Sequence, residues 1–213
     1  LCDDHVHGGG VTGVVLRDVG MTACVSQGAV PLGPELTITA AEGHVIHELA
    51  GRPALARIRS AIGELDDRER GLVSEGLLLG IVIDTGHVEY RQGDFLVRGV
   101  LGVDPDTGSV TVGARVSPGQ VVRLHARDAA SAHRDLRRVL LDHTDAPVAG
   151  ALVFTCNNRG SGLFGVPDHD AQAVTAGLGG VPTAGFHAAG EIGPVGRRSF
   201  LHGFTATVAV FRA

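Results

Sequence analysis

The sequence predicts an α+β fold, with mixed, largely antiparallel sheets and helices packed on one face. The first observation is that β-prone apolar runs come in pairs, separated by short turns, before any alternation of strand, helix and strand begins. The second is that helical periodicity is confined to a few separate segments. This order is typical of antiparallel sheets and argues against a parallel sheet of the Rossmann type.

Two pairs of strands are expected near the start of the chain. Residues 11–16 and 22–25 are rich in β-prone side chains, and the turn at 18–20 between them predicts a hairpin. Residues 36–41 and 45–49 form a second pair around a turn that contains Gly43.

Helices are expected in three places. Pro53 stands where the first turn of a helix tolerates proline, so residues 54–62 are predicted to be helical. The charged stretch 64–70 predicts a solvated helical turn or a linker. Asp128 is a good cap for a helix that runs to about residue 143, and residues 168–178 form the third helix. The predicted buried face of the second helix consists of Ala132, Leu136, Val139 and Leu140.

The remaining apolar runs are predicted to be strands. Four of them precede the second helix and three follow it. They are residues 77–84, 95–103, 109–114, 120–125, 149–155, 182–188 and 204–211. The segment 104–108 (DPDTG) is a strong turn signal between two of these strands.

Composition limits the possible functions. Apolar residues make up 44% of the chain and charged residues 19%, which is ordinary for a globular protein and argues against disorder. The net charge is −5 without a basic cluster, so nucleic-acid binding is not expected. All 18 cationic residues are arginine, which excludes a lysine nucleophile, a Schiff base and a Walker lysine. No dinucleotide-binding or phosphate-loop motif occurs, and no cofactor is expected.

The cysteines and the apolar runs indicate a cytoplasmic protein. The cysteines Cys2, Cys24 and Cys156 are odd in number and scattered, which favours a reducing compartment over a disulfide framework. The longest apolar runs, near 77–83 and 148–154, are too short to span a bilayer. The chain opens inside a patterned segment, so we expect it to be a piece or a processed product of a longer protein.

Residues 150–194 contain the strongest functional pattern. Cys156 follows an apolar run and enters a Gly- and Asn-rich loop that also carries Arg159, and Glu191 follows a second apolar run between two glycines. Loops beyond rigid apolar elements are where α/β proteins place groups that handle ligands. The pattern predicts a polar small-molecule pocket in which these three residues line one cleft.

Each of these side chains also has an ordinary structural interpretation. Cys156 is either a nucleophilic or redox thiol, with His187 or His169 as its base, or a small residue that ends a buried strand. Arg159 either clamps a carboxylate or phosphate or forms an ion pair, with Glu191 or Asp168 as candidate partners. Glu191 either binds an ammonium group of a ligand or forms a structural pair within its loop.

The loop and the chain start carry two further candidates. Residues 157–162 form either a nest of backbone N–H groups for an anion or simply a tight turn. His5 and His7 are spaced to share one face of a strand beside two aspartates, but no third ligand has a metal-site spacing, so no metal site is expected.

Two groups of motif residues occur together in this chain. The C-terminal group consists of Cys156, Asn157, Arg159, Gly160, Phe164, Gly165, Gly185, Phe186, Gly190, Glu191, Ile192, Gly193 and Pro194. The N-terminal group consists of Ser26, Gln27, Gly28, Pro31, Gly33, Gly43, Ile46, Glu48, Leu49, Gly51, Pro53 and Ala54. This combination resembles the FIST family, sensory modules of bacterial signalling proteins. Residues 1–63 resemble the tail of the N-terminal module, and residues 77–213 resemble the C-terminal module.

The resemblance implies intracellular sensing of a small polar ligand, with amino acids or related metabolites as the expected class. It implies no established enzyme activity, and it adds a signalling protein as a possible partner. The alternatives are a cysteine-dependent enzyme that uses Cys156 and a protein-interaction module. The expected ligand-binding residues are Cys156, Asn157, Arg159, Gly160, His187, Gly190 and Glu191.

Overall fold

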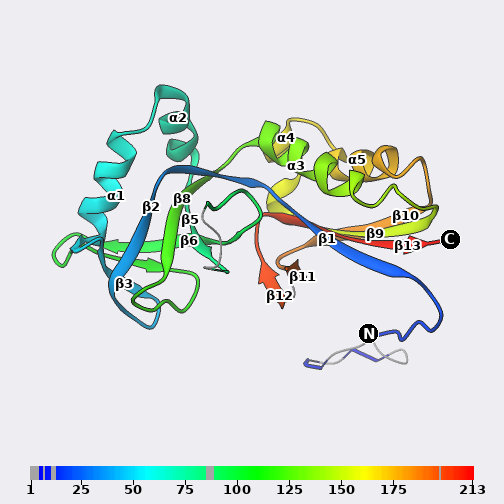
Figure 1. Ribbon diagram of the computed structural model, residues 1–213, viewed down its shortest axis with the longest axis horizontal. Coiled ribbons are helices and arrows are strands. Elements are labelled where there is room, and N and C mark those ends of the chain that lie inside the picture. The colour runs from blue at the N-terminus through cyan, green and yellow to red at the C-terminus, as the bar shows by residue number, and fades with distance from the viewer. Residues whose placement is uncertain (1–4, 7, 11–12, 85–88, 197) are drawn as a thin grey trace.

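The computed structural model describes residues 5–6, 8–10, 13–84, 89–196 and 198–213. Its strands form a seven-stranded sheet, a four-stranded sheet and a two-stranded hairpin, and helices cover part of each large sheet (Figure 1). All strand pairings among the described residues are antiparallel except that of β9 with β10. The α+β class with largely antiparallel sheets is therefore confirmed.

The seven-stranded sheet has the order β2-β8-β5-β6-β7-β3-β4, and an additional pairing between β2 and β3 closes it. Its strands are β2 (Ala29–Glu42), β3 (Val45–Leu49), β4 (Arg52–Pro53), β5 (Leu77–Val82), β6 (Phe95–Asp104), β7 (Ser109–Val112) and β8 (Val121–Arg127). The long strand β2 pairs with β8 through its first half and with β3 through its second half. Bulges between Leu32 and Glu35 and after Ile38 accompany this change of partner, because bulges increase the bend of a strand.

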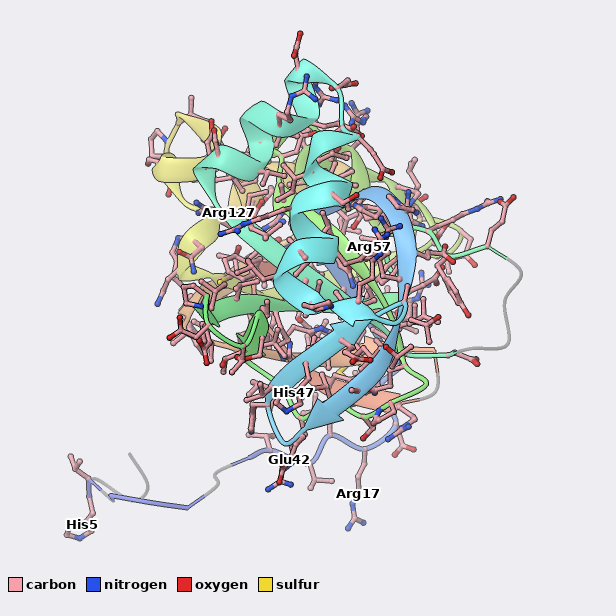
Figure 2. All side chains as sticks on the ribbon, turned by 90° about the vertical axis from the view of Figure 1, so that its left-hand side faces the viewer. His5, Arg17, Glu42, His47, Arg57 and Arg127 are labelled. Carbon is pink, nitrogen blue, oxygen red and sulfur yellow. The ribbon has the colours of Figure 1, made fainter. Side chains whose placement is uncertain are left out.

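Two helices lie beside this sheet. Helix α1 (Ala54–Gly63) buries Ala54, Ile58 and Ala61 in the core of the sheet. Helix α2 (Asp67–Glu75) occupies the charged stretch that was predicted to be a helical turn or linker. It begins with a capping box, in which Asp66 accepts from the Glu69 backbone and Glu69 accepts from the Asp66 backbone. Figure 2 views the molecule from this side, with Arg57 on α1 and with Glu42 and His47 on the β2–β3 hairpin.

The four-stranded sheet has the order β1-β13-β9-β10. Its strands are β1 (Met21–Gln27), β9 (Val148–Cys156), β10 (Thr183–Ala188) and β13 (Thr205–Arg212). Helices α3 (Ala129–Leu141) and α5 (His169–Gly177) lie on one face of this sheet (Figure 1). As predicted, Asp128 caps α3, accepting from the Ser131 backbone, and Ala132, Leu136, Val139 and Leu140 are buried.

A two-stranded hairpin covers the face of the four-stranded sheet that lies opposite the helices α3 and α5, close to one end of the sheet. Strands β11 (Glu191–Val195) and β12 (Arg198–His202) pair with each other. Gly193 lies directly on the sheet, because a Cβ at this position would be 2.4 Å from Val25 Cγ2 and 2.9 Å from Thr207 Oγ1. This hairpin was not predicted, since its glycines and Pro194 are residues that usually mark loops.

Gln27 joins the two halves of the molecule, the four-stranded sheet and the seven-stranded sheet with their helices, at the point where β1 passes into β2. Its backbone N–H donates to Asp135 on α3 at 2.8 Å, and its side-chain amide donates to the Phe95 carbonyl on β6 at 2.7 Å. Gln92 and Gly93 donate to the Gln27 carbonyl and to its side-chain oxygen, respectively. A single buried residue therefore links both sheets through four hydrogen bonds.

One predicted hairpin is wrong. Residues 13–16 are not a strand, Val14 and Val15 are about 85% exposed, and residues 11 and 12 lie outside the described part of the chain. Strand β1 pairs instead with β13 near the other end of the chain, with Val25 opposite Thr207. The pairing with β13 places Cys24 in the core with Val208, which a local hairpin would not do.

The predicted modules 1–63 and 77–213 share both large sheets. Strand β1 pairs with β13, β2 pairs with β8, and β3 pairs with β7. Each large sheet is thus built from strands of both predicted modules. Among the described helices, none is long and apolar enough to cross a membrane.

His125 is the most deeply buried histidine of the seven-stranded sheet. Its ring lies over Gly80 on β5, where a Cβ would be 2.2 Å from His125 Cε1, and its edge contacts the Phe95 ring. Nδ1 lies 3.0 Å from the Arg123 carbonyl, whereas Nε2 has no hydrogen-bond partner among the described residues. Burial lowers the pKa of His125 to about 4, so the ring is neutral in the folded state at neutral pH.

The low pKa of His125 should make folding stability depend on pH. The pKa of His125 in the folded state lies below its ordinary value of 6.5, so the unfolded chain binds the proton more tightly. The free energy of unfolding is therefore highest above pH 6.5, and it decreases as the pH falls towards 4. The expected loss is on the order of 3 kcal/mol. Urea unfolding at several pH values measures it, with His125→Asn as the comparison. Equal pH dependence of the two proteins would contradict this assignment.

Candidate functional site

A pocket of about 220 Å³ lies on the helix-covered face of the four-stranded sheet. Its walls come from the end of β9, the turn after it, the start of α5 and the edge strand β10. The lining residues are Val153, Thr155, Arg159, Gly160, Asp168, His169, Asp170, Ala171, Thr175, Thr183, Ala184, Gly185, Phe186 and His187. The pocket therefore coincides with the segment in which the sequence predicted one.

Local sequence explains how β10 forms one wall. Strand β10 runs parallel to β9, with Gly185 opposite Val153 and His187 opposite Thr155. A Cβ on Gly185 would be 1.8 Å from the Val153 carbonyl oxygen, so only glycine allows the strands to approach this closely. The close approach brings His187 to the pocket, two residues further along the strand.

Arg159 reaches the pocket from a turn of 3-10 helix, η1 (Asn157–Arg159), that directly follows β9. Its side chain is fully buried and forms a bidentate ion pair with Asp170 in the first turn of α5. Nε donates to Asp170 Oδ2 at 2.7 Å, and Nη2 donates to Oδ1 at 3.0 Å. The partner of Arg159 is thus Asp170, and not Glu191 or Asp168 as the sequence suggested.

Asp170 is saturated with hydrogen bonds. Besides Arg159, it accepts from the Thr155 hydroxyl on β9 and contacts His169 Nδ1 at 3.0 Å. Burial alone would raise the pKa of this carboxyl, but the hydrogen bonds and charge of Arg159, with the bonds from Thr155 and His169, lower it below its usual value. Asp170 is therefore a structural anion with no acceptor capacity left for a ligand.

His169 continues this network towards α3. Its Nε2 lies 2.9 Å from Nδ1 of His133, and its ring stacks on Phe164 with a centroid distance of 3.5 Å. Phe164 is the last residue of the short helix α4 (Ser161–Phe164), and the centroid of its ring lies 5.4 Å from the guanidinium carbon of Arg159. The loop after η1 therefore folds over the ion pair and shields it from water.

Cys156, at the end of β9, and Glu191, at the start of β11, are buried and do not line the pocket. Cys156 is 3% exposed, and the amide nitrogen of Asn158 is 3.7 Å from its sulfur. Glu191 is 1% exposed and accepts from the hydroxyl of Thr205 at 2.9 Å. Burial raises the pKa of Glu191, and this shift is opposed by Thr205, by the Cys156 thiol and by the charge of Arg159.

Gly28 lies close to Nη1 of the Arg159 guanidinium. A Cβ on Gly28 would be 2.9 Å from Arg159 Nη1 and 2.4 Å from the carbonyl oxygen of Phe204. That carbonyl accepts from the Gly28 backbone at 2.8 Å, and Phe204 adopts a φ of 65°, which is strained for a bulky residue. Arg159 thus connects the pocket to the point where β1 passes into β2.

The structure divides the predicted ligand-binding residues into two groups. Arg159, Gly160 and His187 line the pocket. The others, Cys156, Asn157, Gly190 and Glu191, are not among its lining residues, and Cys156 and Glu191 are buried. Their contact with a ligand stays a prediction.

Sequence reasoning missed Asp170, His133 and Thr155. Asp170 stands beside His169 in the sequence, but an aspartate in the first turn of a helix is ordinary there, because it complements the helix dipole. Within the described part of the chain, no group of three or more His, Cys, Asp and Glu residues is arranged to hold a metal ion. His5 lies on the N-terminal segment, away from the body of the molecule (Figure 2), and His7 lies outside the described residues.

The sequence matches two family models that together cover most of the chain. Residues 54–194 match the FIST C domain, and residues 1–52 match the FIST N domain. The chain is also 47% identical over 212 residues to the uncharacterized proteins Mb0898c of Mycobacterium bovis and Rv0628c of Mycobacterium tuberculosis. Each match covers 98% of this chain and 55% of the relative, so the chain spans about half the length of the curated relatives it matches.

Replacing Asp170 with asparagine should destabilise the fold strongly. The change leaves the buried guanidinium of Arg159 without a counter-charge, which costs about 3–5 kcal/mol in comparable buried pairs. Asp168→Asn is the matched control, because Asp168 is exposed and asparagine tolerates its left-handed backbone, φ 56°. Urea denaturation should show a large loss for the first variant and about 0.5 kcal/mol or less for the second. Similar losses in both would refute the structural role of the pair.

Gly28→Ala should also destabilise the protein, by about 1–3 kcal/mol, because the new methyl group would overlap a backbone carbonyl that cannot move cheaply. Gly102→Ala on β6 is the control, since a Cβ there meets no atom within 4 Å. Thermal and urea unfolding of the two variants compare them directly. A Gly28→Ala protein as stable as the control would show that Arg159 and Phe204 are not held as described.

Proposed function

The chain belongs to the FIST family, and on that premise we propose that it binds a small polar metabolite, an amino acid or a close relative, in the pocket between β10 and α5. FIST domains are sensory domains that bind small ligands. The observation that supports the proposal is the pocket itself, which is lined by the family-motif residues Arg159, Gly160 and Gly185.

The size of the pocket favours a ligand as small as an amino acid. Its volume of about 220 Å³ is below the range of roughly 300–1,000 Å³ that is usual for sites of drug-sized molecules. The walls combine an apolar side, Val153, Ala184 and Phe186, with polar groups from α5 and from His187. A small molecule with a charged end and a short apolar part fits this combination.

The charges around the pocket favour a zwitterion. The first turn of α5 borders the pocket, and the Asp168 side chain makes no capping hydrogen bond to it, so the N–H groups of this turn are candidate donors for a ligand carboxylate. His187 supplies a further donor. The exposed carboxylate of Asp168 at the rim is a partner for an ammonium group. In this arrangement Asp168 takes the role that the sequence suggested for Glu191, and Arg159 acts by fixing the start of α5.

We further propose that binding takes place in the cytoplasm and is passed to a signalling partner. The buried cysteines Cys24 and Cys156 are unpaired, which suits a reducing compartment. Catalysis by Cys156 has less support, because its thiol is buried and the ring nitrogens of His169 contact Asp170 and His133. A role as an interaction module has exposed Phe186 on the edge strand β10 in its favour.

Differential scanning fluorimetry tests the proposed ligand class against amino acids, dicarboxylates and nucleotides. A ligand that binds only the native state raises the unfolding midpoint with the logarithm of its concentration over its dissociation constant. An amino acid should raise the midpoint, His187→Ala should weaken the effect at least tenfold, and Asp168→Asn should weaken it only for ligands with an ammonium group.

The control is His47→Ala, because His47 is exposed on β3, in the other sheet. This variant should bind as the unmodified protein does. A shift with nucleotides alone, or a shift that survives His187→Ala unchanged, would overturn the proposed site.

A further inference from the structure

A second cleft, of about 470 Å³, lies at the junction of the two halves of the molecule. One wall is helix α3, which packs on the four-stranded sheet, and the other is the segment that leads into β6 of the seven-stranded sheet. Its lining residues are Arg91, Gln92, Asp94, Ser131, Arg134, Asp135 and Arg138. Three of these seven residues are arginines, although the chain as a whole has a net charge of −5.

Gln27 holds the two walls of this junction cleft together. The side-chain amide of Gln92 donates to the Gln27 carbonyl at 2.9 Å, and the Gln27 backbone donates to Asp135 at 2.8 Å. The cleft is therefore built on a buried hydrogen-bonded residue, and its walls have a set separation before any ligand binds.

Both carboxylates of the cleft are engaged by its own walls. Asp135 is 5% exposed and accepts from Arg138 at 2.8 Å as well as from Gln27. Asp94 accepts from the backbone N–H of Arg91 at 2.7 Å. Arg138 is thus neutralised by Asp135, and the remaining charges of the cleft are those of Arg91, Arg134 and Asp94.

Arg91 and Arg134 have weaker counter-charges than Arg138. Arg134 donates to the Ser131 hydroxyl at 2.8 Å, and no described carboxylate lies within ion-pair distance of its guanidinium. The carboxylate nearest to Arg91 is that of Glu89 at 3.9 Å, and both of these side chains are about 80% exposed, so this pair is weak. Arg134 and Arg138 are also four residues apart on α3, where like charges repel.

We propose that this cleft binds the phosphate group of a small phosphorylated metabolite, with Arg91 and Arg134 donating from opposite walls. Guanidinium groups recognise phosphate through paired hydrogen bonds, and Arg91 and Arg134 are the cleft arginines that are not held in a close ion pair. The volume lies within the usual range for small-molecule sites, which leaves room for the rest of the metabolite. The site is independent of the pocket at β10, and it takes a different chemical class.

Inorganic phosphate is the probe, titrated at pH 7.5 and constant ionic strength with sodium chloride as the reference salt. Phosphate should raise the unfolding midpoint with the logarithm of its concentration. Arg134→Gln and Arg91→Gln should each weaken apparent binding about tenfold or more. Arg137→Gln is the matched control, because Arg137 is an exposed arginine of the same helix that does not line the cleft. Circular dichroism confirms that each variant is folded.

The phosphate response should persist in His187→Ala, which separates this site from the amino-acid pocket. A midpoint that rises no more with phosphate than with chloride would overturn the proposal. The proposal would also be overturned if phosphate raised the unfolding midpoint of Arg134→Gln as much as that of Arg137→Gln. Stronger stabilisation by a short dicarboxylate than by phosphate would also overturn it, since the site would then recognise carboxylates.

Discussion

The buried ion pair between Arg159 and Asp170 is the interaction on which the pocket depends. A guanidinium with no exposed surface is tolerated only when its charge is matched, and Asp170 supplies a bidentate partner. The remaining nitrogen, Nη1, has no hydrogen-bond partner among the described residues. Because Thr155 also donates to Asp170, the pair ties the end of β9 to the first turn of α5. The space between these two elements and β10 follows from that link.

The glycines of the family motifs act through close approach as much as through flexibility. Gly28 leaves room for the Arg159 guanidinium and the Phe204 carbonyl, Gly185 for the Val153 carbonyl on β9, and Gly193 for Val25 beneath the β11–β12 hairpin. At each of these glycines, neighbouring atoms occupy the space that a side chain would need. The motifs thus describe how tightly these elements are packed.

Both proposed sites adjoin the segment where β1 passes into β2. Arg159 reaches from the pocket to Gly28, and Gln27, the preceding residue, supports the junction cleft between α3 and β6. A ligand at either place therefore borders the hydrogen bonds that join the two sheets. A ligand that binds more tightly to one geometry of the junction would favour that geometry, and the position of one large sheet relative to the other would change. Such a response to a ligand is what a sensory domain requires.

Local sequence patterns were enough to predict the fold class, the β2–β3 hairpin, the helices α1, α3 and α5, and the segment that carries the pocket. These features depend on signals between near neighbours in the sequence, such as the cap at Asp128 and the spacing of apolar residues. Three other features became visible only in the folded chain: β1 pairs with β13, Arg159 pairs with Asp170, and Cys156 and Glu191 are buried. Strand partners and buried charge partners are chosen by packing between distant segments, and the same local pattern is compatible with several such choices.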